Sequence, residues 1–150
     1  MCLLRCPTEM PKKPIYTSPQ EVESAFYEAL ERGDLDAMMT VWSEDEEIVC
    51  IHPGSARLAG YAMVREGWRQ IFQGSNRLKV QLLALSTVHA PFFAVHSLVE
   101  QISVVGEKHL VAPVAATNVY VRGAQGWRMI MHHASPVPPN SIGDAPHVLH

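Results

Sequence analysis

Apolar residues recur along the first half of the chain at the spacing of amphipathic helices. Ser18 and Pro19 are typical of a helix start, and Gly33 is typical of a helix end. Between them, apolar residues follow one another every three or four positions, at Val22, Phe26, Ala29 and Leu30. The same periodicity predicts a second helix that begins after Asp34 and includes Trp42, and a third over residues 60–72.

The second half of the chain consists of apolar stretches separated by turn residues. A short strand is predicted at residues 46–52, before the third helix, and four long ones follow at residues 78–88, 92–105, 110–121 and 127–133. Short turns between successive long strands indicate an antiparallel meander. Both faces of these strands are apolar, and the helices can cover only one. We therefore expect a homodimer that packs through the other face of the sheet.

The length and charge of the chain limit its class. At 150 residues it forms one domain, which we place at residues 18–138, between an N-terminal arm (1–17) and a C-terminal tail (139–150). A net charge of −3 and scattered basic residues exclude a basic stripe for nucleic acid or for an anionic membrane surface. No signal-peptide core or membrane-spanning stretch is present in the sequence, so a cytoplasmic protein is expected.

Two predicted strands are apolar along their length and end in histidine, a pattern typical of strands that line a cavity. These ends are His52 and the pair His132-His133. By strand alternation, His133 should face the helices together with Trp127, Met129 and Met131, whereas His132 should face the dimer partner or solvent. Imidazole exchanges protons near neutral pH, so His52 and His133 are candidate catalytic groups. The alternative is that both are structural, satisfied by neighbouring backbone or loop groups.

Four further residues are candidate ligand contacts, each with a structural alternative. Glu100 shares a strand face with His96, and is either an acid in a pocket or part of an ion pair at an interface. Trp42 and Trp68 form either a pocket wall or the core. The Asn118 amide either donates a hydrogen bond to a ligand oxygen or satisfies a backbone group in a bulged strand. The eight histidines and three cysteines match no metal-binding spacing, so neither a metal ion nor a cofactor is expected.

Several local strings give the sequence a family resemblance. They are Ala37-Met38-Met39 with Trp42, Cys50–Gly54, Trp68–Phe72, Ala116–Val119, and Trp127-Arg128-Met129 with His132–Pro136. Together with the order of predicted elements, they resemble the bacterial SnoaL-like (ketosteroid isomerase-like) branch of the nuclear transport factor 2-like superfamily, across residues 18–138. The resemblance implies an α+β cone in which three N-terminal helices pack on a strongly curved, mostly antiparallel sheet with an internal pocket.

The resemblance leaves the chemistry open, because one fold serves many functions in this superfamily. Its members include isomerases, cyclases, dehydratases, epoxide hydrolases and modules that only bind or scaffold. The isomerase pattern requires carboxylates where this chain has His52 and Asn118. A dehydratase-like site with His52 and His133 acting on a small hydrophobic or carbonyl-bearing molecule matches best, as a cofactor-independent isomerase or lyase. The alternative is a non-catalytic ligand-binding or dimeric scaffold module.

Overall fold

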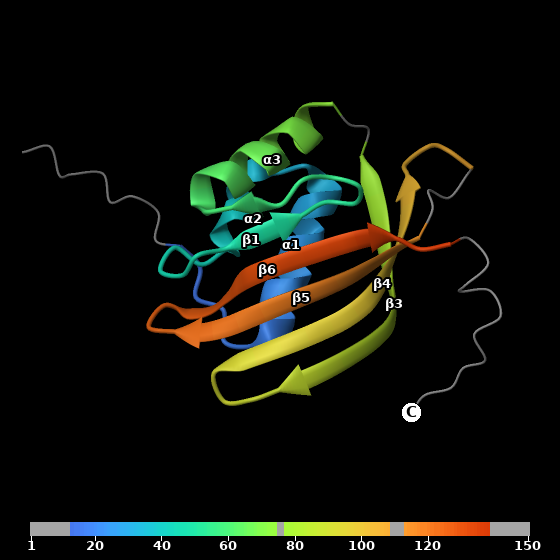
Figure 1. Cartoon of the computed structure of the whole chain (residues 1–150). Coiled ribbons are helices and arrows are strands. Elements are labelled where there is room, and N and C mark those ends of the chain that lie inside the picture. The colour runs from blue at the N-terminus through green and yellow to red at the C-terminus, as the bar shows by residue number, and fades with distance from the viewer. Residues whose placement is uncertain (1–12, 75–76, 109–112, 139–150) are drawn as a thin grey trace, which may run out of the picture.

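The computed structural model describes residues 13–74, 77–108 and 113–138 (Figure 1). Most of the predicted arm (1–12), the predicted tail (139–150) and the start of the predicted strand at residues 110–121 lie outside the described residues.

The helices α1 (Pro19–Arg32) and α3 (Tyr61–Gln73) form where the periodicity predicts them. The second helix, α2 (Leu35–Thr40), is shorter than predicted: it ends before Trp42, which instead forms a β-bridge with Met129. The Ser18 hydroxyl caps α1 by accepting a hydrogen bond from the Glu21 N–H at 3.2 Å. Gly33 ends that helix with a φ of 62°, and the Asp34 carboxylate caps α2 directly afterwards. Within the described residues, none of the helices is long and apolar enough to cross a membrane.

The described strands form one sheet in the order β2-β1-β6-β5-β4-β3. Their bounds are β1 Val49–Ile51, β2 Leu58–Ala59, β3 Leu78–His89, β4 Phe93–Val104, β5 Val114–Gly123 and β6 Gly126–Pro136. β3 to β6 form the predicted antiparallel meander, and β1 lies parallel to β6. β2 was not predicted: it lies between the predicted strand at residues 46–52 and the predicted third helix, and it pairs with β1.

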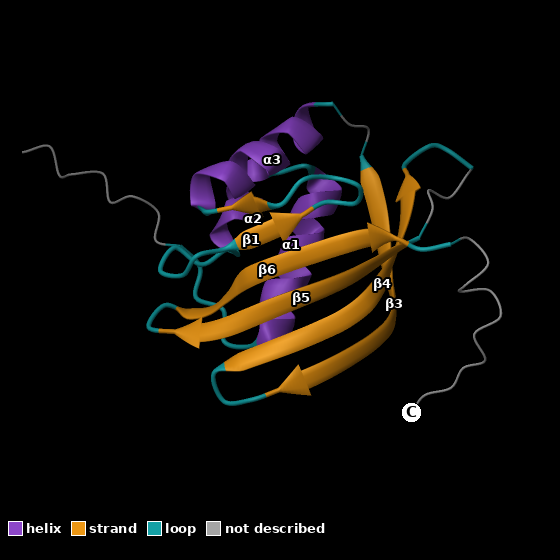
Figure 2. Ribbon diagram, viewed as in Figure 1, coloured by secondary structure: helices purple, strands orange, loops and turns teal. Residues whose placement is uncertain are grey.

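The sheet curves around α1, which confirms the α+β architecture (Figures 1 and 2). Two irregularities in strand pairing accompany the curvature, since an extra residue bends a strand and increases its twist. One lies in β3 between Leu83 and Ser86, where Ala84 has a positive φ of 54°. The other lies in β6, where Met131 pairs with Val119 and Met129 pairs with Tyr120. Ile130 is therefore an extra residue in β6.

The space between α1, α3 and the sheet is filled by side chains. Phe26 of α1 is fully buried, and its ring lies 5.5 Å from that of Trp68 and 6.4 Å from that of Trp42, measured between centroids. Met129 and Tyr120 are also fully buried on the inner face of the sheet. These large residues occupy much of the volume in which the sequence predicts an internal pocket.

Residues just before α1 pack against the start of β6. The Trp127 N–H donates to the Tyr16 carbonyl at 2.9 Å, and Arg128 donates from Nη2 to the Pro14 carbonyl at 2.7 Å. A Cβ at Gly126 would lie 2.6 Å from the Tyr16 oxygen, so the close approach requires glycine, whose φ here is 84°. The last residues of the predicted arm are therefore part of the packed structure.

Candidate functional site

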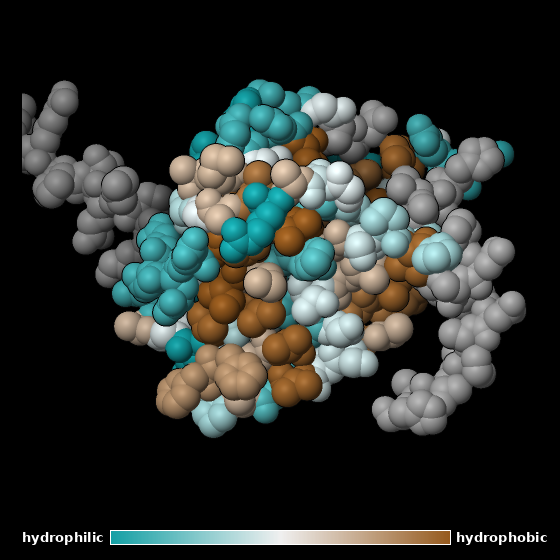
Figure 3. Space-filling model, viewed as in Figure 1, coloured by the Kyte–Doolittle hydropathy of each residue, from teal (hydrophilic) through white to brown (hydrophobic). Residues whose placement is uncertain are grey.

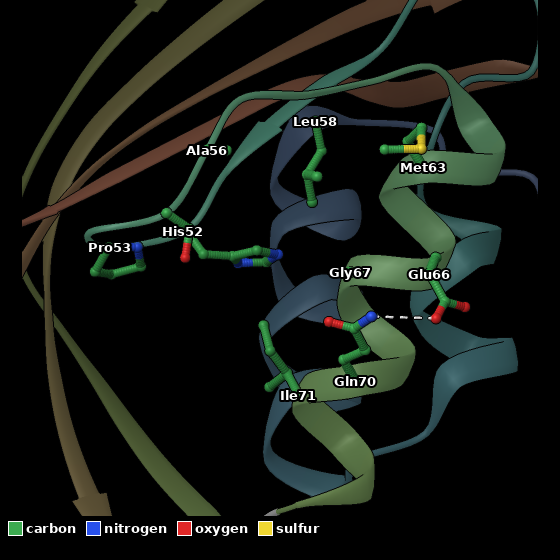
Figure 4. Close-up of a pocket in the computed structure, with 10 residues that line it drawn as sticks. His52, Pro53, Ala56, Leu58, Met63, Glu66, Gly67, Gln70 and Ile71 are labelled. Carbon is green, nitrogen blue, oxygen red and sulfur yellow. Dashed lines mark hydrogen bonds between the residues drawn. The ribbon is translucent and has the colours of Figure 1, made fainter.

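A cleft opens between α3 and the segment that follows β1 (Figure 4). Its volume is about 560 Å³. The lining is largely apolar, with Leu58, Met63 and Ile71 among its residues. Its polar groups come from His52, Ser55, Glu66 and Gln70. Figure 4 shows the His52 ring pointing from the end of β1 toward α3 at Gly67. A Cβ at Gly67 would lie 2.4 Å from Leu58 Cδ1 and 3.4 Å from His52 Nε2, so this glycine lets both side chains approach the helix closely.

His52 connects this cleft to the interior. Its side chain is 9% exposed, and its ring meets that of Trp68 edge-on with 4.6 Å between centroids. Its Nε2 lies 3.6 Å from Cys50 Sγ. Burial lowers the pKa of His52 to about 4, so the ring is neutral at physiological pH.

The structure reverses the predicted orientation of the two histidines in β6. His132 is buried and faces the helices, whereas His133 is exposed on the outer face. The cause is the extra residue Ile130, because one additional residue inverts the inward and outward alternation beyond it. Trp127 and Met129 face inward as expected, but Met131 and His133 do not, and His132 continues the inner face instead.

A row of buried hydrogen bonds joins α1 to three strands. The Tyr27 hydroxyl donates to Glu100 Oε2 at 2.7 Å and accepts from Asn118 Nδ2 at 3.0 Å. Asn118 Oδ1 in turn accepts from His132 Nδ1 at 2.6 Å. Because an amide oxygen can only accept, His132 carries a proton on Nδ1. We call Tyr27, Glu100, Asn118 and His132 the inner polar row.

Burial controls the charge of this row. It raises the pKa of Glu100 to about 7, and the hydrogen bond from Tyr27 acts in the opposite direction. It lowers the pKa of His132 to about 3, with smaller contributions from the neighbouring imidazoles of His52 and His133. At neutral pH the row therefore holds a neutral imidazole and a carboxyl group close to its midpoint of ionisation.

Aromatic side chains separate the cleft from the inner polar row. The His52 and His132 ring centroids are 6.5 Å apart, and Trp68 lies against both rings, with its own centroid 6.1 Å from that of His132. The Phe26 ring approaches His132 to 4.9 Å.

The predicted site residues separate into two groups. The structure brings His52, Trp68, Glu100 and Asn118 to one side of the core, but places His133 on the outer face. Trp42 is fully buried, and the cleft lining does not include it. Glu100 and His96 both face inward, yet each has another partner, Tyr27 for the former and Glu23 for the latter.

Sequence reasoning missed two members of the row, Tyr27 and His132. Tyr27 follows Phe26 on the inward side of α1, and this position was the available signal. His132 carried none, because its orientation depends on the bulge. Among the described residues, no three or more His, Cys, Asp or Glu side chains gather in a way that could hold a metal ion.

The described architecture is similar to that of several solved structures. A candidate calcium/calmodulin-dependent protein kinase type II association domain from Thiobacillus denitrificans is 38% identical, covers 83% of this chain and 99% of its own, and has a TM-score of 0.77. A candidate dehydratase of the nuclear transport factor 2-like family from Streptomyces avermitilis is 29% identical, with coverages of 77% and 91% and a TM-score of 0.70. A protein of unknown function with a cystatin-like fold from Nostoc punctiforme is 11% identical, covers 79% of this chain and 88% of its own with a TM-score of 0.69, and is alike in fold alone.

Sequence comparison identifies the family. F-box protein SKIP8 of Arabidopsis thaliana is 25% identical over 114 residues, which are 76% of this chain but only 47% of that protein. This chain therefore spans about half the length of that relative. The sequence model of the SnoaL-like domain matches residues 20–139, from the first turn of α1 to beyond the end of β6. With its curved sheet and these matches, the chain belongs to the SnoaL-like domain family of the nuclear transport factor 2-like superfamily.

Proposed function

We propose that this protein binds a small hydrophobic molecule carrying a carbonyl oxygen in the cleft between α3 and the end of β1. The observation that carries the proposal is a neutral, largely buried His52 at the base of a mainly apolar cleft. The volume of about 560 Å³ is within the range of small-molecule sites. Apolar walls supply binding free energy, and an imidazole N–H is a suitable donor to a carbonyl oxygen.

A second candidate function is proton transfer at the same place. Its support is the position of His52 between the cleft and the inner polar row, together with 29% identity to the candidate dehydratase. In such a dehydration, neutral His52 removes a proton from the carbon beside the carbonyl. It then passes this proton to the neighbouring hydroxyl, which leaves as water while a carbon–carbon double bond forms.

We also propose that two copies of the chain pair through the outer face of the sheet. Half-buried apolar side chains project there from β4 and β5, at Val95, Val99, Val119 and Val121, beside the more exposed Phe93. Figure 3 shows hydrophobic side chains gathered over the middle of this face. No described helix covers it, and a second copy would bring an identical apolar surface to it.

Filling the cleft should abolish ligand binding without unfolding the protein. Met63 lines the cleft and is 55% exposed, so Met63→Trp should be tolerated and should narrow the opening. The adjacent, exposed Ala62 does not line the cleft, and Ala62→Trp is the matched control. At about 100 times its dissociation constant, an apolar ketone such as 2-acetylnaphthalene should stabilise wild type and the control by about 2.7 kcal/mol in thermal unfolding. Equal stabilisation of Met63→Trp, or no effect from a panel of apolar carbonyl compounds, would contradict the proposal.

If His52 transfers protons, His52→Gln should slow dehydration by about 10²- to 10⁴-fold while leaving the folded structure intact. The assay follows enone absorbance as 4-hydroxy-4-phenylbutan-2-one is converted. The exposed His133, on the opposite face of the sheet, provides the control variant His133→Gln. Turnover that falls equally in both variants would rule out the specific role of His52.

Replacing Glu100 should change how stability depends on pH. The folded carboxyl has a pKa of about 7 against an ordinary value of 4.5, so ionising it at neutral pH is less favourable in the folded state than in the unfolded state. Stability should therefore fall as pH rises from about 4.5 through 7, and Glu100→Gln should remove this loss. The variant should gain at most on the order of 3 kcal/mol over wild type at about pH 8, and little at about pH 5, in urea unfolding. The exposed Glu47→Gln is the control; an advantage independent of pH would show that Glu100 does not titrate in this range.

The pairing of two copies predicts a dimer in sedimentation equilibrium at micromolar concentration. Val119→Lys places a charge in the middle of the outer face and should give a monomer with little change in unfolding. Ala124→Lys, in the exposed turn between β5 and β6, should remain dimeric. A monomeric wild type would refute the proposed pairing.

A further inference from the structure

A second cluster of polar side chains lies far from the cleft, at the opposite edge of the sheet. It contains His89 at the end of β3, His96 in β4, and Gln20 and Glu23 in the first turns of α1. None of these residues takes part in the inner polar row. Their arrangement requires its own explanation, because His96 is completely buried yet directs a ring nitrogen toward the exposed His89.

The fold fixes the orientation of the His96 ring. Its Nδ1 is hydrogen-bonded to Glu23 Oε2, and the carboxylate can only accept, so the proton lies on Nδ1. The ring of Tyr120 packs edge-on against it, with 5.0 Å between centroids. In the neutral imidazole the lone pair is then on Nε2, which faces His89 Nε2 at 3.3 Å.

Strand pairing brings the second imidazole to the same place. Thr87 pairs with His96 and His89 pairs with Ala94, so the two histidines are diagonal neighbours on one face of the β3–β4 hairpin. The hairpin is closed by a hydrogen bond of 2.8 Å from the Ala90 N–H to the Phe93 carbonyl. The position of the exposed ring is therefore set by the backbone.

The 3.3 Å between the two ring nitrogens is a hydrogen-bond distance, and a metal ion shared by both rings would hold the nitrogens equally far apart. Two imidazole nitrogens bound to tetrahedral zinc at about 2.0–2.1 Å lie roughly 3.3–3.4 Å from each other. A carboxylate on the far nitrogen of a ligating histidine is the usual support in such sites, because it fixes the tautomer and strengthens the ligand. Glu23 stands in this position behind His96.

Gln20 offers a third ligand. Its amide lies 3.4 Å from His89 Nε2, and a half-turn of the amide places the oxygen at that position. His89 and Gln20 are exposed, so water can fill the remaining coordination position. We propose that His89, His96 and Gln20 bind a divalent transition-metal ion such as zinc, with Glu23 orienting His96. This site is independent of the cleft and of the function proposed for it.

The test is a calorimetric titration of the full-length reduced protein with zinc chloride. His89→Ala is the decisive variant, because His89 is exposed at a strand end and its removal should leave the fold intact. The exposed His133→Ala is the matched control for loss of a surface imidazole. Compared with wild type, His89→Ala should lose one equivalent of bound zinc, whereas His133→Ala should lose none. Glu23→Gln should weaken the same equivalent by about 10- to 100-fold.

The chain contains eight histidines and three cysteines, so only the zinc equivalent that disappears in His89→Ala reports on this site. A second readout is the imidazole nitrogen resonances of His89 and His96, which should shift together on addition of zinc in wild type. Unchanged stoichiometry and affinity in His89→Ala would overturn the proposal. Absence of zinc binding in wild type would also overturn it, and would leave the two rings as a pair that only shares a proton.

Discussion

The packing of α1 against the sheet depends on the three buried hydrogen bonds of the inner polar row. Tyr27, Glu100, Asn118 and His132 come from four different elements, and each of their hydrogen bonds fixes the orientation of the next side chain. A buried donor or acceptor left without a partner costs about 1–3 kcal/mol, so a shift of any one element is penalised at several places. The row therefore fixes the position of α1 relative to the three strands, which the surrounding apolar contacts specify less strictly.

The bulge at Ile130 makes this row possible. With regular alternation, His133 would face α1, and Asn118 would meet the side chain of a different residue. The extra residue turns His132 inward, where its Nδ1 meets the Asn118 amide. The bulge is defined by the pairing of β6 with β5, so the apolar and polar pattern of β6 alone does not predict it. This is why the sequence predicted a histidine at the end of the last strand facing inward but assigned the wrong one of the two.

Much of the remaining fold could be predicted because local chemistry specifies it. Ser18 and Gly33 bound α1 through capping, and the turns between β3 and β6 follow from glycine, proline and short connections. β2 was not predictable, because two residues pairing with β1 leave no periodicity. The sequence also did not predict that side chains fill the interior. From the sequence, Trp42 and Trp68 could belong either to the core or to a pocket wall. Their packing against Phe26 shows that they belong to the core.

Because the interior is filled, the accessible chemistry lies at the edges of the sheet, and the two edges treat histidine differently. Near the β2 edge, His52 is neutral because burial opposes its charge, and its ring contacts a thiol, a weak hydrogen-bonding group. Such an imidazole can still donate to, or take a proton from, a molecule in the cleft. At the β3 edge, a carboxylate occupies one nitrogen of His96 and directs the other outward. That arrangement increases the electron density of the free nitrogen and suits a cation. The two proposals, an organic ligand at one edge and a metal ion at the other, therefore rest on the same side chain and differ in the group that lies behind it.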